Sequence, residues 1–182
     1  SICILAPKMI DCFNHPNITV YTCSDVKGVN GYVGNFKVKV LRRPRYIDEE
    51  KCTGCGDCIN ACPYEAPDEF NVGLGRRRSA HLYFQQAVPR VAIIDEKTCT
   101  RCGNCKAVCD AGAVDLCQKS KEFELEVNAI VVATGLDVFD PSAMSEYGYG
   151  KYRDVITALQ YERLINAAGP TGGHLERISD KR

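Results

Sequence analysis

The chain lacks a net charge, a membrane-length apolar run and a complete dinucleotide-binding glycine motif. Its 182 residues carry 23 Lys plus Arg and 23 Asp plus Glu, so the formal charge is zero. A balanced charge argues against a nucleic-acid or other polyanion partner. No stretch approaches the ~20 apolar residues that a membrane-spanning helix needs. The length then suggests one domain or two small ones.

Chemical motifs of several other kinds are also missing. The histidines His15, His81 and His174 are scattered, and no nucleophile–base arrangement is visible, so we predict no catalytic residue. No G-x-G-x-x-G, the turn that binds the pyrophosphate of a dinucleotide, occurs anywhere in the sequence. The first residues have neither an initiator methionine nor a signal-peptide pattern, and we expect a fragment of a longer protein.

The twelve cysteines, by contrast, are abundant and patterned. Eight of them form two runs, Cys52-x-x-Cys55-x-x-Cys58-x-x-x-Cys62 and Cys99-x-x-Cys102-x-x-Cys105-x-x-x-Cys109. This is the bacterial ferredoxin spacing, and two copies predict two [4Fe–4S] clusters. Oxygen-sensitive clusters and reduced thiols together point to a reducing cytoplasm.

The shape of the cluster predicts how the ligands are shared. A short loop with cysteines at its first, fourth and seventh positions can meet three iron corners, but it cannot reach the fourth. In two-cluster ferredoxins the fourth cysteine of each run binds the other cluster. We therefore predict two crossed ligand sets: Cys52, Cys55, Cys58 and Cys109 for one cluster, and Cys99, Cys102, Cys105 and Cys62 for the other.

Zinc and disulfides are the alternative uses of these cysteines. A structural zinc site takes four ligands, usually as two C-x-x-C pairs, and a third cysteine at the same spacing is surplus. Disulfides form mainly in secreted proteins, and no secretory signal peptide is visible in this sequence. The four remaining cysteines have no ligand spacing, and we expect them to pack as small apolar residues: Cys3, Cys12, Cys23 and Cys117.

The residues around the two runs are themselves repeated. Ile47-Asp48-Glu49 before the first run matches Ile94-Asp95-Glu96 before the second, at an offset of 47 residues. Each half predicts a short strand, a cluster loop and a one-turn helix. The longer segment between the runs, residues 63–98, predicts a surface loop with some order of its own.

The flanks predict one hairpin that the cysteine-rich part interrupts. Residues 36–40 and 123–127 both alternate between apolar and charged residues, with lysines in the first and glutamates in the second. Opposite charges attract across an antiparallel pair. We therefore expect these strands to pair, and two unrelated edge strands are the alternative.

Three further elements are expected outside the runs. Residues 18–21 predict a strand after the turn at His15 to Asn17, and residues 129–133 predict a fully buried strand that ends at Thr134-Gly135. Thr157-x-x-Gln160 fits a capping box and predicts a helix from Ala158 to about Ala167. Gly169-Pro170 would stop that helix.

Several motifs carry a resemblance to a known family. Ala133-Thr134-Gly135 resembles the strand-turn that lies near the flavin in two-dinucleotide-binding flavoproteins. Together with the cysteine runs, three glycine-rich stretches make the chain similar to an internal segment of the heterodisulfide reductase A subunits, which are iron–sulfur flavoproteins. These stretches are residues 31–38, 68–75 and 169–174. Asp110 departs from the proline that usually follows the fourth cysteine.

The resemblance implies an α+β fold, in which a two-[4Fe–4S] bacterial-type ferredoxin module interrupts part of an FAD-binding, thioredoxin-reductase-like α/β domain. The implied parts are a first flavin-domain segment at residues 1–41, the ferredoxin insertion at 42–121 and a second flavin-domain segment at 122–182. Ala133, Thr134 and Gly135 would contact FAD in the complete protein. The chain alone would lack the phosphate-binding turn.

The resemblance also implies the function. The segment would relay electrons between FAD and partner clusters in a CoB–CoM heterodisulfide reductase complex with flavin-based bifurcation, and it would not be catalytic alone. The implied partners are the other reductase subunits, an electron-donating hydrogenase or formate dehydrogenase, and ferredoxin. The alternatives are a stand-alone ferredoxin-type carrier, the equivalent part of a bacterial complex, and a zinc-stabilised interaction module.

Overall fold

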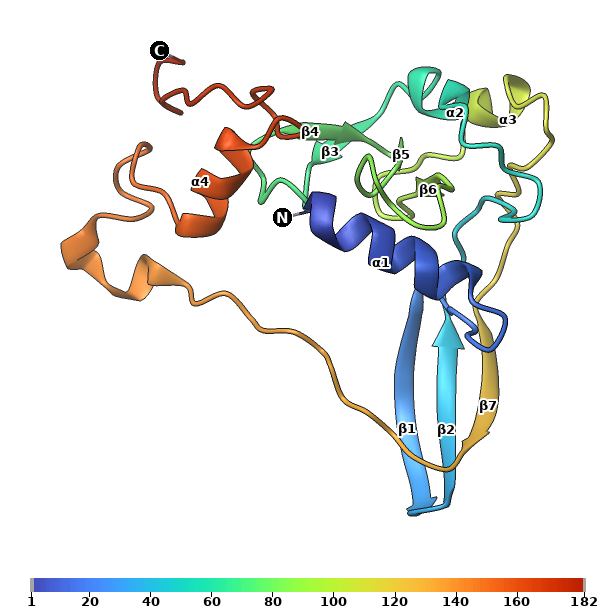
Figure 1. Cartoon of the computed structure of the whole chain (residues 1–182). Helices are drawn as coiled ribbons and strands as arrows, with labels where there is room; N and C mark the ends of the chain where they lie inside the picture. The colour runs from blue at the N-terminus through green and yellow to red at the C-terminus, as the bar shows by residue number, and fades with distance from the viewer. Residues whose placement is uncertain (1, 182) are drawn as a thin grey trace. The chain divides into compact units, whose positions relative to one another are not determined.

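The computed structural model describes residues 2–181 as a mixed α/β chain (Figure 1). Its helices are α1 (Ile2–Asn14), α2 (Asp57–Asn60), α3 (Asn104–Ala107) and α4 (Ala158–Ile165), with 3₁₀ turns η1 (Pro141–Ala143) and η2 (Ser145–Tyr147). Its strands are β1 (Ser24–Tyr32), β2 (Asn35–Arg42), β3 (Glu65–Pro67), β4 (Arg76–Arg78), β5 (Ala80–His81), β6 (Ile93–Ile94) and β7 (Lys121–Val127).

Two compact units divide the chain. The first runs up to Glu65 and resumes from Arg78 to Val132, and the second combines Ala66–Arg77 with the chain from Ala133 onward. The cysteine runs and the strands β1, β2 and β7 all belong to the first unit. Among the described residues, no helix is long and apolar enough to cross a membrane.

A three-stranded antiparallel sheet with the order β1-β2-β7 forms one end of the first unit (Figure 1). The predicted hairpin is confirmed, since Phe36 pairs with Val127 and Val40 pairs with Phe123. Lys37 lies opposite Glu126, and its ammonium is 3.4 Å from that carboxylate. Strand β1 adds a neighbour that the sequence had not predicted. The chain between β2 and β7 therefore leaves and re-enters one sheet.

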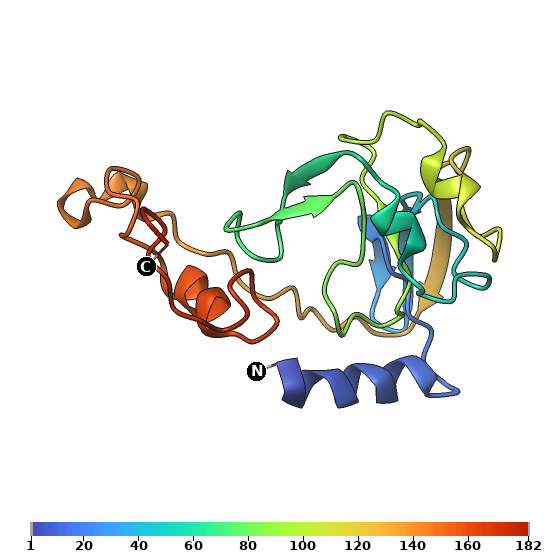
Figure 2. The same cartoon turned by 90° about the horizontal axis from the view of Figure 1, so that it is seen from above.

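The part between β2 and β7 repeats one small unit twice. Figures 1 and 2 show the one-turn helices α2 and α3, which the repeat predicted, side by side. Ile47, before the first run, forms a β-bridge with Val114, after the second run. The core packs both halves together through these buried residues: Tyr46, Ile47, Cys58, Cys62, Ala80, Val91, Ala92, Ile94, Cys105, Ala113 and Val114.

The segment between the runs has the local order that was predicted, but it is not wholly a surface loop, because Ala80, Val91 and Ala92 are buried in the core. Strand β3 pairs with β4, and β5 pairs with β6. Ser79, which is fully buried, connects the two halves of the repeat. Its backbone N–H donates to Tyr64 and its carbonyl accepts from Asp95, both at 2.8 Å, and its hydroxyl lies 2.5 Å from the hydroxyl of Thr98.

Two predicted strands are wrong. Residues 18–21 form an irregular segment, and the first strand begins only at Ser24. Residues 129–133 are also irregular, and Val131 is 91% exposed where a buried strand was expected. A strand needs a neighbour for its backbone N–H and C=O groups, and within residues 2–181 no strand pairs with this segment. Helix α1, which contains Pro7, was not anticipated.

The second unit forms around α4, whose predicted start is confirmed. The Thr157 hydroxyl accepts from the Gln160 backbone, and the Gln160 side chain accepts from the Thr157 backbone. The helix ends at Ile165, two residues before the predicted end. Buried Arg163 fastens the 66–77 loop to α4, because its guanidinium stacks 4.7 Å from the centre of the Phe70 ring and its Nε donates to Asn71.

The first unit has a polar junction where the sheet meets the cysteine-rich part. The Arg45 side chain is 11% exposed and donates from Nε to Glu49, from Nη1 to the Val91 carbonyl and from Nη2 to the Thr22 hydroxyl. Arg42 also pairs with Glu49 at 2.8 Å. Burial raises the pKa of Glu49, but the hydrogen bond from Arg42 and the charges of both arginines outweigh it, so the pKa lies below its usual value.

We predict that Arg45→Met lowers the free energy of unfolding by about 2–3 kcal/mol, because it keeps the side-chain stem but removes three charge-assisted hydrogen bonds. Arg43→Met is the matched control, since Arg43 is 60% exposed and pairs with Asp25 on the surface. That change costs less than ~1 kcal/mol. Anaerobic urea unfolding of the cluster-loaded protein measures both. Equal losses would show that the junction contributes no more than a surface pair.

Candidate metal centre

Matching turns present the first cysteine of each run. The backbone N–H of Cys52 donates to the Asp48 carbonyl, and that of Cys99 donates to the Asp95 carbonyl, both at 3.0 Å. Each aspartate also accepts, through its side chain, from the backbone N–H two residues on, again at 3.0 Å. The repeated Ile-Asp-Glu motif is therefore the structural start of both cysteine loops.

A glycine then turns each loop into its short helix. Gly56 and Gly103 precede α2 and α3 with φ of 94° and 87°, a region that glycine enters without the cost a Cβ imposes. Gly54 is constrained further, because a Cβ there would lie 2.7 Å from the Arg90 carbonyl oxygen. These turns direct Cys58 and Cys105, the third cysteines of the runs, into the buried core.

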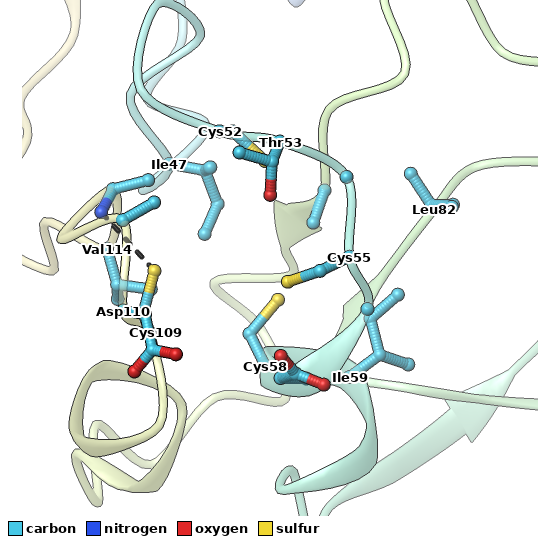
Figure 3. Close-up of a pocket in the computed structure, with 16 residues that line it drawn as sticks. Ile47, Cys52, Thr53, Cys55, Cys58, Ile59, Leu82, Cys109, Asp110 and Val114 are labelled. Carbon is cyan, nitrogen blue, oxygen red and sulfur yellow. Dashed lines mark hydrogen bonds between the residues drawn. The ribbon is translucent and has the colours of Figure 1, made fainter.

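The first predicted ligand set lines a single cavity of about 360 Å³. Cys52, Cys55 and Cys58 come from the first run, and Cys109 comes from the end of the second. Figure 3 shows Cys109 across the cavity from Cys55 and Cys58. The rest of the lining is mostly apolar, with Ile47, Ile59, Leu82, Ala92, Ala113 and Val114 among its residues. Cys109 thus lies where the loop of the first run cannot place a cysteine.

The thiols of the second predicted ligand set lie near one another. The charges of Cys99, Cys102 and Cys62, the last from the other run, contribute to raising the pKa of Cys105. Cys62 and Cys105 are both buried. In each set the middle cysteine of the C-x-x-C-x-x-C loop, Cys55 or Cys102, is the exposed one. The two halves therefore have the same arrangement of thiols.

The thiols of both sets affect one another's ionisation. Burial, followed by the charges of neighbouring cysteines, raises the pKa of Cys58 to about 11. Burial and the charge of Cys99 likewise raise the pKa of Cys105. Four anionic thiolates at one place repel one another unless cations lie between them. Iron ligation therefore has to displace these protons and supply the neutralising charge.

The residues fit a polynuclear iron–sulfur cluster. Four thiols surround an apolar space in the first set, and backbone N–H groups point at ligand sulfurs in both sets. The N–H of Ala113 lies 3.3 Å from the Cys109 sulfur, and the N–H of Arg101 lies 3.3 Å from the Cys99 sulfur. Such donors stabilise thiolate ligands. Cys52, Cys55, Cys58 and Cys109 would hold one cluster, and Cys99, Cys102, Cys105 and Cys62 the other.

A contact that the sequence did not reveal covers the second cysteine loop. The Arg101 guanidinium lies 5.7 Å from the centre of the buried Tyr46 ring and 3.6 Å from the Glu96 carboxylate. Burial and the hydrogen bond to Glu96 raise the pKa of Tyr46. Glu96 belongs to the repeated Ile-Asp-Glu motif, but the contacts of Glu96 and Arg101 with Tyr46 depend on the path of the chain between β2 and the first run.

The expected flavin contacts are not assembled within the described chain. Ala133, Thr134 and Gly135 lie in an exposed, irregular stretch. Gly135 has a φ of 77°, and a Cβ there would meet no atom within 4 Å. The predicted close approach of a cofactor to this glycine therefore stays a prediction. Of the three histidines, His81 is buried in β5, and its Nδ1 lies 3.1 Å from the Ser79 carbonyl oxygen.

The fold and the cysteine sites define a ferredoxin-type domain with two [4Fe–4S] clusters. Residues 51–114 match the family described as the 4Fe-4S dicluster domain. This match covers both cysteine runs and ends at the β-bridge residue Val114.

The whole chain is similar to heterodisulfide reductase subunits of methanogens. It is 59% identical over 180 residues to a CoB–CoM heterodisulfide reductase iron-sulfur A subunit of Methanopyrus kandleri. It is 52% identical to the A subunit of the H(2):CoB-CoM heterodisulfide,ferredoxin reductase of Methanothermobacter marburgensis. In both comparisons the match covers 99% of this chain and 27% of the relative.

A third relative has a different electron donor in its name. The chain is 55% identical over 177 residues to the A subunit of the H(2)/formate:CoB-CoM heterodisulfide,ferredoxin reductase of Methanococcus maripaludis, covering 97% of this chain and 27% of the relative. The chain therefore spans about a quarter of the length of the relatives that it matches. It belongs to the family of heterodisulfide reductase A subunits, of which it is an internal segment, and the predicted resemblance is confirmed.

We predict that serine variants of the cysteines fall into two crossed groups. Cys109→Ser and Cys55→Ser alter the same electron paramagnetic resonance signal of the reduced protein, because both residues line the first cavity. Cys62→Ser and Cys102→Ser alter the other signal. Cys117→Ser is the control, since that exposed cysteine lies outside both sets. If Cys109→Ser instead alters the signal that Cys102→Ser alters, each run binds its own cluster.

Proposed function

We propose that this segment relays single electrons between the flavin of the full-length protein and clusters of partner subunits. The observation that carries the proposal is the cavity that three cysteines of the first run line together with Cys109 of the second. Each would hold one [4Fe–4S] cluster, whose chemistry is one-electron reduction and reoxidation. The chain itself would supply the ligands, the insulation and the spacing between the sites.

The arrangement of residues supports close sites within a rigid frame. The charge of Cys105 contributes to raising the pKa of Cys58, although the two cysteines belong to different predicted sets. Both lie in one packed core, which holds the loops in place and keeps water from the buried ligands. Two clusters held in this way would exchange electrons without a movement of the chain. No residue of the segment is proposed to break or form a bond.

The flavin and the domain division are further parts of the proposal. FAD would be held mainly by residues of the full-length protein that are outside this chain, and Ala133 to Gly135 would form one wall of its site. The ferredoxin insertion at 42–121 would then interrupt a flavin domain made from 1–41 and 122–182. The pairing of β2 with β7 supports this division, since the cysteine-rich part leaves and re-enters one sheet.

The relatives' names suggest the wider reaction. They specify a CoB-CoM heterodisulfide, ferredoxin, and hydrogen or formate. We infer that the full-length protein works with other reductase subunits and with a hydrogenase or formate dehydrogenase. The flavin would divide electron pairs between the heterodisulfide and ferredoxin in a bifurcating complex. A reducing cytoplasm suits the free cysteines.

The metal content tests the central part of the proposal. We predict about eight iron and eight acid-labile sulfide per chain, four of each for every [4Fe–4S] cluster. The anaerobically purified protein would be brown. Bound zinc with four or fewer irons would contradict two clusters and favour a zinc-stabilised module. Elemental analysis together with sulfide release makes the distinction.

The flavin dependence tests the division of labour. Residues 1–182 contain no glycine-rich turn to bind the pyrophosphate, so the loaded segment should bind FAD weakly or not at all in equilibrium dialysis. The same preparation should still accept electrons from a strong reductant into its clusters. Tight, stoichiometric FAD binding by this segment would show that the flavin site is complete within it.

A further inference from the structure

The two cysteine sites are related by the repeat but differ in charge. In the repeat, positions 47 residues apart are equivalent. We compare the equivalent positions that lie between two cysteines of a run or directly follow its last cysteine. Four pairs change in charge: Gly54 with Arg101, Asp57 with Asn104, Ile59 with Lys106, and Pro63 with Asp110. Since the halves otherwise share turns, helices and thiol arrangement, these positions are where one site can become electrostatically unlike the other.

Both acidic members of these pairs belong to the first site. Asp57 and Asp110 line the cavity of Cys52, Cys55, Cys58 and Cys109. Asp110 is in the second run, but it follows Cys109 and is carried to the first site by the exchange of the fourth ligands. The equivalent residues next to the second site, Asn104 and Pro63, are uncharged.

The basic residues of these pairs make the second site more positive than the first only in part. Lys106 lies in the last turn of α3 and directly follows the buried ligand Cys105. Arg101 is less decisive, because its charge is offset by Glu96 at 3.6 Å. The loop of the first run also has an arginine nearby. The aliphatic part of the Arg90 side chain packs on Gly54, and its Cγ would lie 3.4 Å from a Cβ added to that glycine. Lys51 directly precedes Cys52 of the first site, where Thr98 precedes Cys99, but its charge is offset by Asp48 at 3.5 Å. The remaining difference among the groups without such an ion pair is two carboxylates, Asp57 and Asp110, against the ammonium of Lys106.

We propose that these charges make the two clusters unequal in reduction potential, with the first site lower and the second site higher. This inference rests on the proposed function, because it requires a cluster at both sites. A carboxylate disfavours an added electron nearby, and an ammonium favours it. One electron would therefore pass from the first site to the second, with no bond formed or broken and no proton transferred. Asp57, Asp110 and Lys106 set the direction of the relay.

Other determinants of potential are similar at the two sites. The ligands are four cysteines in each, and a backbone N–H lies 3.3 Å from a ligand sulfur in each. One ligand of each set is exposed to solvent, Cys55 or Cys102. Charge, hydrogen bonds to sulfur and exposure are the levers by which a protein tunes an iron–sulfur potential. Exposure differs at the fourth ligand, since Cys109 of the first set is partly buried and Cys62 of the second set is buried. Charge differs at several positions next to the ligands.

The experiment is an anaerobic redox titration, followed by electron paramagnetic resonance, of the full-length protein with its clusters. Cys109→Ser first identifies which couple belongs to the first site. Asp57→Asn with Asp110→Asn should then raise that couple, changing its reduction equilibrium about tenfold, or about 59 mV for one electron. Lys106→Gln should lower the other couple by a smaller amount. Both shifts should shrink at high salt, because the charged groups are exposed.

Glu122→Gln provides the matched control. It removes the same charge from an exposed position on β7, outside both sites, and should move neither couple. The inference is overturned if the aspartate variants keep their iron and sulfide and leave the couples unchanged, or if the first site has the higher potential. A wild-type protein with four or fewer irons would overturn the proposed function instead.

Discussion

A four-cornered cluster needs four thiolates, and a loop with cysteines at its first, fourth and seventh positions supplies three. This constraint is the reason for our proposal that Cys62 and Cys109 each bind the cluster of the opposite half of the repeat. Exchange of the fourth ligand requires α2 and α3 to lie side by side, as they do in Figures 1 and 2. It also requires the apolar residues of both halves to share a single core.

The frame around the sites follows from the same requirement. Both halves begin at an aspartate turn, and Ser79 ties the chain after the first run to the chain before the second. The sheet β1-β2-β7 receives both ends of the cysteine-rich part, while Arg45 and Glu49 fix the junction. Rigid ligand loops suit electron transfer, since little rearrangement then accompanies a change of charge. A stand-alone ferredoxin-type carrier would not need a sheet whose strands lie on both sides of the cysteine-rich part in the sequence, whereas an inserted module would.

The sequence predicted best where the pattern was local or repeated. Cysteine spacing predicted that Cys109 lies near the thiols of the first run, and these four cysteines line one cavity. The alternating charges predicted the register of β2 with β7, and Thr157 with Gln160 predicted the start of α4. Prediction failed at residues 18–21 and 129–133, where apolar β-branched residues suggested strands. Amino-acid composition does not show whether a neighbouring strand is present to pair with. The relatives are also nearly four times as long as this chain, so the chain covers only about a quarter of their length. Contacts such as Arg101 with Tyr46 depend on tertiary structure and leave no pattern in the sequence.

The central claim is that crossed ligation holds two clusters close together in one rigid core. Electron paramagnetic resonance of the fully reduced, cluster-loaded chain of residues 1–182 tests it most directly, because each reduced [4Fe–4S] cluster carries an unpaired spin. Ligands exchanged between the halves hold the two clusters close, so we predict an integrated intensity of about two spins per chain, one for each cluster, with broadening or splitting from their magnetic interaction. A single sharp signal of one spin, or two signals that show no interaction, would contradict it.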